Sequence, residues 1–207
     1  MEISVARALT ELKTINNRIE KKIDETIFIA GVKKTSKKIK NVYTRDEFID
    51  LAKSNYQSIK DLIKRRKDIK SAIVESNANT IVEIAGVKMS VADAIERKNS
   101  IELDKMLLAE MTRDYNSIVS QVQAQNEDVE MRLDSLLNSS IGSDKKDLGG
   151  MEGFAKAYRE SNEYEIINPL NLEDEIKKLS KQIEDFESEV DAVLTESNVM
   201  TKIEIPD

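Results

Sequence analysis

The stretch ESNANTIVEI at residues 75–84 decides the fold, and it has a near-copy, ESNVMTKIEI, at residues 196–205. Six of the ten positions are identical, and in each copy an amphipathic helical pattern passes into a β-like run. We therefore predict the same helix-to-strand corner twice, in which an Asn takes the left-handed conformation that ends a helix and a Thr begins a strand. These residues are Asn77, Thr80, Asn198 and Thr201.

Long amphipathic helices are predicted on both sides of these corners, because apolar residues recur there at spacings of three and four. The first begins at Val5 with Ser4 as its N-cap, and the second opens with the capping box at residues 44–47, in which Thr44 is the N-cap. A third runs from residue 91 to about residue 137 without Gly or Pro, and the last starts near Asn171 with the heptad spacing of a coiled coil.

Shorter segments separate the helices. Residues 80–89 predict a β-hairpin, because two β-rich runs flank a two-residue turn that contains Gly. Residues 27–43 predict a basic loop or edge strand, and the Ser- and Gly-rich residues 138–170 predict a flexible insertion. Residues 171–207 are expected to form a coiled-coil helix followed by a terminal strand.

The expected fold is all-α, with long antiparallel helices and a small β-hairpin or sheet element at one end. Residues 1–207 are expected to form a single helical domain. A monomer leaves much of the long apolar stripes uncovered, so we expect self-association into a closed homo-oligomer.

The composition excludes several classes of function. His, Cys and Trp are all absent, so there is no thiol nucleophile, His-dependent triad, disulfide or zinc cluster. No nucleotide-binding glycine motif occurs either. We therefore predict a protein that is not an enzyme, with no catalytic residue, no cofactor and no metal. No apolar run reaches 18 residues, so we expect a cytoplasmic protein without a membrane partner.

Charge is concentrated in one zone. Residues 33–70 hold thirteen basic and five acidic residues, a balance of +8, although the whole chain carries −7. Such a zone suits an anionic ligand, an acidic partner or the acidic helix of a neighbouring subunit. A solvated helix face with a mobile loop is the alternative, and for such charge runs it is the commoner outcome. Duplex DNA is not expected as a partner, because the motifs and the net charge are unfavourable.

A family resemblance rests on residues 76–108, in which Asn77, Thr80, Gly86, Ser90, Ala94 and Arg97 precede an amphipathic helix. This region resembles a family of small helical bacterial and phage proteins sometimes labelled septicolysin-like. Asn198 and Thr201 are similar to the family's closing N-W-x-T element, with Val199 in place of Trp. The resemblance implies an α-helical oligomer with a small β element and no established activity.

Two functions follow as hypotheses. The first is a non-enzymatic homo-oligomer that sequesters a small, phosphate-bearing, nucleotide-derived ligand, as a phage sponge against host immune signalling would. The alternative is a structural or assembly protein whose helices and basic segment dock protein partners. Basic side chains that converge in a closed interface would favour the ligand, and exposure on an outer face would favour the partner. The candidate ligand-binding residues are Lys33, Lys34, Lys37, Lys38, Arg65, Arg66, Asn77, Thr80, Arg97, Asn198 and Thr201.

Overall fold

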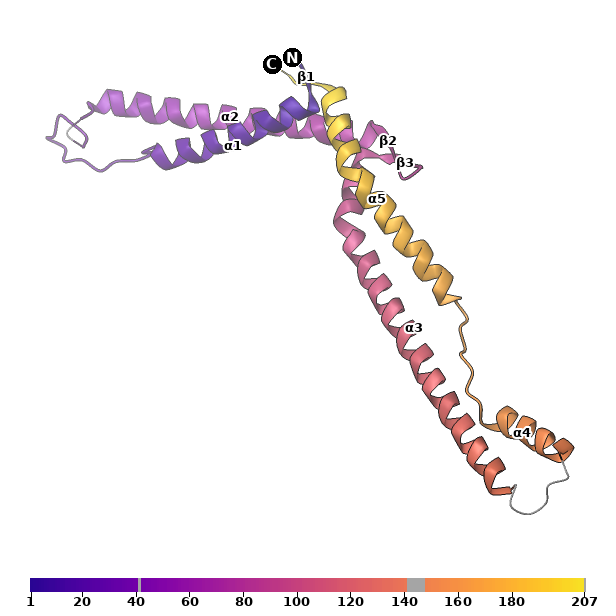
Figure 1. Cartoon of the computed structure of the whole chain (residues 1–207). Helices are drawn as coiled ribbons and strands as arrows, with labels where there is room; N and C mark the ends of the chain where they lie inside the picture. Colours follow the sequence, from indigo (N-terminus) through magenta and orange to yellow (C-terminus); the bar gives the residue numbers. More distant parts are fainter. Residues whose placement is uncertain (41, 141–147, 207) are drawn as a thin grey trace. The chain divides into compact units, whose positions relative to one another are not determined.

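The computed structural model describes residues 1–40, 42–140 and 148–206 and is all-α with a small β content (Figure 1). The predicted fold class is therefore confirmed. In chain order its elements are β1 (Glu2–Ser4), α1 (Val5–Glu25), α2 (Arg45–Asn79), β2 (Ile81–Ile84), β3 (Val87–Ser90), α3 (Val91–Ser140), α4 (Leu148–Asn162), α5 (Leu172–Met200) and β4 (Lys202–Glu204).

The chain, expected to form a single domain, divides into two compact units. The first contains Met1–Asn99 and Phe186–Asp207, and the second contains Ser100–Asp185. In the first unit α1 and α2 form a helical hairpin, and all four strands lie there. The second unit contains α4 and the remaining lengths of α3 and α5, where the Tyr115 hydroxyl donates to Glu173 Oε2 over 3.1 Å.

The core of the first unit is built from both ends of the chain. Its buried residues come from β1, α1, α2 and the C-terminal segment, and they are Ile3, Val5, Ala8, Ile15, Ile69, Ile73, Ile203 and Ile205. Complete burial of one such isoleucine contributes roughly 1.5–3 kcal/mol. The strands at the two ends of the sequence are therefore part of the framework that fixes the base of the α1/α2 hairpin.

Two small antiparallel sheets form the helix-to-strand corners. β2 pairs with β3, with Ile81 opposite Ser90, and β1 pairs with β4, with Lys202 opposite Ser4. The predicted hairpin at residues 80–89 and the terminal strand are confirmed, whereas β1 was not anticipated. Each sheet connects the end of one helix to the start of another.

The same backbone hydrogen bonds occur at both corners. At the first, Thr80 N–H donates to the Ser76 carbonyl oxygen (2.9 Å), and the Thr80 carbonyl accepts from Val91 N–H (2.9 Å). At the second, Thr201 N–H donates to the Ser197 carbonyl oxygen (2.9 Å). The Thr201 carbonyl likewise accepts from Val5 N–H (3.0 Å). The repeated sequence therefore builds a repeated structure.

The correspondence extends beyond the quoted repeat. The segment SVARA at residues 4–8 and the segment SVADA at residues 90–94 occupy equivalent places after β1 and β3. Equivalent residues are buried in both, namely Val5 with Val91, Ala8 with Ala94, Ile15 with Ile101 and Ile205 with Ile84. The chain thus consists of two strand–helix–helix–strand halves, β1–α1–α2–β2 and β3–α3–α5–β4.

The predicted left-handed caps at Asn77 and Asn198 are wrong. Both residues lie inside helices, and the cap of α2 is Thr80 in an extended conformation, at φ −83° and ψ 121°. The chain passes directly from helix to strand, so no left-handed residue is needed. Positive φ occurs instead in the hairpin turn, at Ala85 (51°) and Gly86 (74°), as a two-residue turn of this kind requires.

The irregular structure expected for residues 138–170 is wrong for residues 148–162, which form α4. Its glycines lower helix propensity, but packing overrides that cost. Ala155 is buried, Met151 and Tyr158 are half-buried, and Arg159 Nε lies 2.6 Å from Glu130 Oε1 on α3. Of the expected loop, residues 141–147 lie outside the described residues.

Candidate docking surface at the tip of the hairpin

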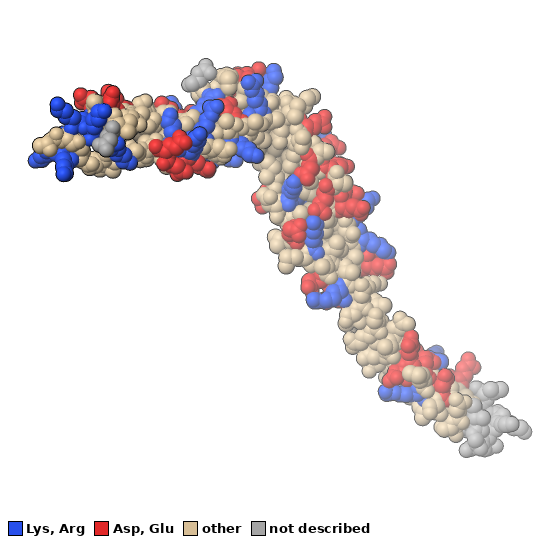
Figure 2. All heavy atoms as spheres, turned by 60° about the vertical axis from the view of Figure 1, so that its left-hand side comes forward, with Lys and Arg blue, Asp and Glu red and all other residues tan. Residues whose placement is uncertain are grey.

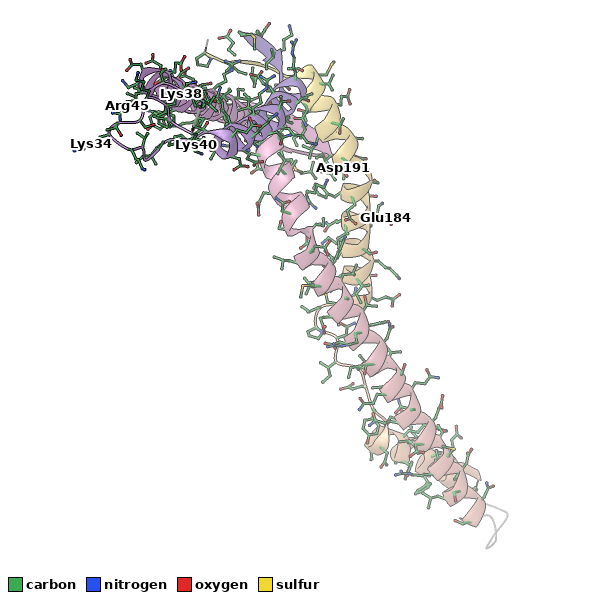
Figure 3. All side chains as sticks on the ribbon, turned by 90° about the vertical axis from the view of Figure 1, so that its left-hand side faces the viewer. Lys34, Lys38, Lys40, Arg45, Glu184 and Asp191 are labelled. Carbon is green, nitrogen blue, oxygen red and sulfur yellow. The ribbon has the colours of Figure 1, made fainter. Side chains whose placement is uncertain are left out.

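Residues 26–45, which are the connection from α1 to α2 and the first residue of α2, form what we call the basic tip. It lies at the end of the α1/α2 hairpin away from β1 and β4 (Figure 1). The segment contains six basic residues and no acidic residue. Figure 2 shows Lys and Arg side chains gathered over this end of the hairpin, and Figure 3 labels Lys34, Lys38, Lys40 and Arg45 there.

Arg45 organises the backbone of the basic tip. As the first residue of α2, it donates from Nη2 to the carbonyl oxygens of Lys33 (3.2 Å) and Lys34 (2.9 Å). A single antiparallel bridge follows, in which Ile39 N–H donates to the Tyr43 carbonyl oxygen (2.7 Å). The described residues of the segment 27–43 therefore form a loop with one bridge, rather than an edge strand.

The lysines of the basic tip point away from this scaffold. The predicted site residues Lys33, Lys34, Lys37 and Lys38 are all exposed, as is Lys40. None of the five forms an ion pair with a carboxylate among the residues that the structure describes. Because each ammonium is a hydrated point charge on a flexible stem, the group can meet an acidic surface without fixed geometry.

Large apolar side chains are exposed beside these lysines. The exposed fractions are 50% for Phe28, 86% for Ile29 and 63% for Val42. Such side chains contribute apolar contact area when a partner covers them, at about 25 cal/mol per Å². The surface thus combines positive charge with uncovered apolar area.

A capping box fixes the basic tip to α2. The Thr44 N–H donates to Glu47 Oε2 (2.7 Å), and the Glu47 N–H donates to Thr44 Oγ1 (3.3 Å), as the sequence predicts. The hydrogen bond from the Thr44 backbone is the main cause that lowers the pKa of Glu47. The Thr44 side chain and the nearby charge of Lys38 add to it.

A groove of about 650 Å³ lies between α1 and α2 below the basic tip. Its lining residues are Arg18, Lys21, Lys22, Glu25, Thr26, Tyr43, Leu51, Asn55, Ser58 and Leu62. Sequence reasoning missed Arg18 and Lys22, because they precede the basic zone at residues 33–70. Their spacing of four places them on one face of α1, which was the available signal.

Arg65 and Arg66 lie away from the basic tip, and both form hydrogen bonds with neighbouring segments of the chain. Arg65 donates from Nε to Glu11 Oε1 (3.1 Å) and from Nη1 to the Pro206 carbonyl oxygen (2.6 Å). Arg66 donates from Nε to Asn16 Oδ1 (2.6 Å). Both arginines therefore connect α2 to neighbouring segments.

The remaining predicted site residues lie at or near the corners. Asn77, Thr80, Asn198 and Thr201 belong to the two helix ends, and the backbone of each Thr is used by the sheets. The Arg97 guanidinium stacks 4.6 Å from the ring centre of Phe186. The candidate set thus separates into a group at the tip, a group along the hairpin and a group at the corners.

Comparison with known proteins assigns no family. No family model matches the chain, and neither a curated protein nor a solved structure matches it. The resemblance to the septicolysin-like family therefore stays a prediction. Among residues 1–40, 42–140 and 148–206, no helix is both long and apolar enough to cross a membrane. In that same part of the chain, no three carboxylates are grouped so that they could hold a metal ion.

Proposed function

We propose that this chain is a non-catalytic assembly protein whose basic tip docks on an acidic surface of a protein partner. One observation carries the proposal: residues 26–45 combine six basic residues, no acidic residue and exposed Phe28 and Ile29. The basic side chains are exposed at the outer end of the hairpin, which favours a partner over a closed ligand site.

Charge and apolar area have different roles in this proposal. The lysines attract an acidic partner and accelerate the encounter, and this effect weakens as salt rises. Exposed ion pairs contribute only about 0–1 kcal/mol each, so most of the affinity comes from burial of the apolar side chains. The partner is therefore acidic and partly apolar, rather than a polyanion alone.

Self-association is part of the proposal. On α3, the side chains of Leu103, Met106 and Leu107 have exposed fractions of 67%, 66% and 53%. Neighbouring apolar residues of this kind mark surfaces that another protein covers. A homo-oligomer would cover the stripe and present several basic tips together, so that weak individual contacts act jointly.

The test uses two labelled peptides of equal length, one of alternating Glu and Leu and one of alternating Lys and Leu. Fluorescence anisotropy at low salt should show binding of the acidic peptide alone. Lys34→Glu with Lys38→Glu should weaken that binding at least about tenfold, because like charges then face each other. Lys13→Glu with Lys64→Glu, which changes the net charge equally on exposed helix positions, is the control. Equal affinities for the two double variants would refute docking through the tip.

A second candidate is the sequestration of a small anionic, nucleotide-derived ligand, and the groove below the tip favours it. Arg18 and Lys22 supply positive charge, and Tyr43, Asn55 and Ser58 supply hydrogen-bonding groups. A panel of nucleotides and inorganic pyrophosphate, tested by thermal shift, should raise the melting temperature of the wild type. Arg18→Ala with Lys22→Ala should abolish the shift, with Lys13→Ala as the control. An identical shift in the groove variant would remove the groove as the site.

A further inference from the structure

A second segment of the chain mirrors the basic tip in charge. Residues 182–201, which include most of α5 and the corner Thr201, contain six acidic residues and no basic residue. These are Glu184, Asp185, Glu187, Glu189, Asp191 and Glu196. Residues 26–45 have the same length, with six basic residues and no acidic residue. The two segments carry −6 and +6.

Three of these carboxylates form one stripe along α5, which we call the acidic face. Glu184, Glu187 and Asp191 follow one another at spacings of three and four, so they lie on the same side of the helix. All three are exposed, and Figure 3 labels Glu184 and Asp191 on α5. Asp191 forms an ion pair with Lys98, so the stripe already accepts a lysine at one end.

The basic tip cannot reach the acidic face of its own chain. α1 has 21 residues, which corresponds to about 30 Å, and it separates the tip from the β1–β4 corner. α5 ends at that corner, at Met200. Glu189 on the same stretch of α5 accepts from Ala85 N–H (2.7 Å), so this stretch lies beside the β2–β3 turn. The 35 residues of α2, about 50 Å, separate that turn from the tip, so a tip that docks there must come from another molecule.

We propose that the basic tip of one copy docks on the acidic face of a second copy of this chain. The proposal rests on the proposed docking function and names its partner. The lysines of the tip would pair with Glu184 and Glu187.

The contact joins two different surfaces, so it is head-to-tail. Such a contact produces a closed ring if the rotation between copies closes, and an open filament if it does not. It also brings together opposite charges in a protein whose net charge of −7 otherwise makes copies repel each other. Association should therefore be strongest at low salt, in contrast to association through the apolar stripe of α3.

The experiment measures the salt-sensitive part of self-association by analytical ultracentrifugation of the full chain. A tip variant carries Lys34→Glu with Lys38→Glu, and a face variant carries Glu184→Lys with Glu187→Lys. Circular dichroism confirms that each is folded. Each variant alone should raise the dissociation constant at least about tenfold at low salt. An equimolar mixture of the two should recover association, because the unaltered tip of the face variant then meets the unaltered face of the tip variant.

Three results separate the possibilities. Wild-type association in either variant alone, or no recovery in the mixture, overturns docking between copies. If the tip nevertheless binds the acidic peptide, the proposed function survives and the partner is a different protein. If the chain stays monomeric and its tip binds phosphatidylserine vesicles but no acidic peptide, both proposals fail in favour of a lipid surface. Lys13→Glu with Lys64→Glu, as the control, should leave association within about twofold of the wild type.

Discussion

The two halves of the chain differ in the side-chain contact that joins their two helices at equivalent positions. Glu11 and Arg97 are equivalent, because each stands seven residues after the serine that caps its helix. Their partners Arg65 and Phe186 are equivalent too, because each stands fifteen residues before the corner threonine. In the first half an arginine pairs with a carboxylate, and in the second half an arginine lies over an aromatic ring.

The difference shows what the fold needs at this position. Arg65 lies on α2, the second helix of its half, whereas Arg97 lies on α3, the first helix of the other half. The arginine is therefore on the opposite helix of the pair in the two halves. The strand pairing, the threonine hydrogen bonds and the buried valine and alanine are the same in both halves. The corners therefore fix the architecture, and the contact between the helices is free to vary.

The largest effect should come from removing the aromatic partner. Phe186 is 1% exposed, so Phe186→Ala should lower the free energy of unfolding by about 3–5 kcal/mol through lost burial and a cavity. Arg65→Ala should cost about 1–3 kcal/mol, because it leaves Glu11 and the Pro206 carbonyl without their donor. Urea unfolding followed by circular dichroism measures both. Equal losses in the free energy of unfolding would show that the two contacts stabilise the fold equally, although their chemistry differs.

Removing the two serine N-caps should change the free energy of unfolding by amounts that differ less. Ser90 and Asp93 form reciprocal hydrogen bonds, with Asp93 N–H to Ser90 Oγ at 3.0 Å and Ser90 Oγ to Asp93 Oδ2 at 2.7 Å. Ser4 only accepts from Arg7 N–H at 3.3 Å. We expect Ser90→Ala to cost about 1–2 kcal/mol and Ser4→Ala about 0.5–1 kcal/mol, measured by the same unfolding experiment. A larger cost at Ser4 would contradict this order.

A smaller change should make the halves more alike. Arg7 occupies the place of Asp93, so Arg7→Asp would supply the missing acidic partner to Ser4 and place a negative charge at the helix N-terminus. The expected gain is about 0.3–1 kcal/mol. Arg7→Ala separates this gain from the simple loss of a positive charge. If both variants shift stability equally, Ser4 has gained no capping partner.

The smallest effect is a pH dependence of local stability at the start of α2, beside the basic tip, that is absent at its other end, beside the corner. The pKa of Glu47 is lowered by the hydrogen bond from Thr44, so the folded state favours the carboxylate. This contribution is present above the ordinary value of 4.5 and is lost as pH falls through the lowered folded value. After correction for the intrinsic exchange rate at each pH, the protection of amides near Phe48 should therefore fall at acid pH, while the protection near Ile73 stays high. Glu47→Gln should remove the pH dependence at the tip end.

Much of this fold follows from local sequence signals. The repeat at residues 75–84 and 196–205 predicts two similar corners, and the turn at Ala85-Gly86 predicts the hairpin. The structure of the repeat was misread at its asparagines, because an Asn near a helix end does not reveal whether the chain turns or continues into a strand. The three-residue β1 is too short for periodicity to detect, although the shared Ser-Val-Ala after it was a usable signal.

The candidate surface was predictable only in part. The run of lysines at residues 33–38 indicates an exposed basic segment, and the structure leaves these side chains exposed. The ion pair between Arg65 and Glu11 depends on the register between α1 and α2, which no local sequence pattern specifies. α4 forms despite its glycines because contacts such as Arg159 with Glu130 come from a distant helix.

The pairing of Met1 with Ile205 has a consequence for chain connectivity. Met1 N donates to the Ile205 carbonyl oxygen (2.8 Å), and Ile205 N–H donates to the Met1 carbonyl oxygen (3.0 Å). Val87 and Ile84 hold the same places in the other half, where the two residues Ala85 and Gly86 join them. A circularly permuted chain, with Ala-Gly between Ile205 and Met1 and new ends at the Ala85–Gly86 bond, would keep every strand pair. The pairing therefore predicts that the order of the segments along the chain can be changed without rebuilding the core.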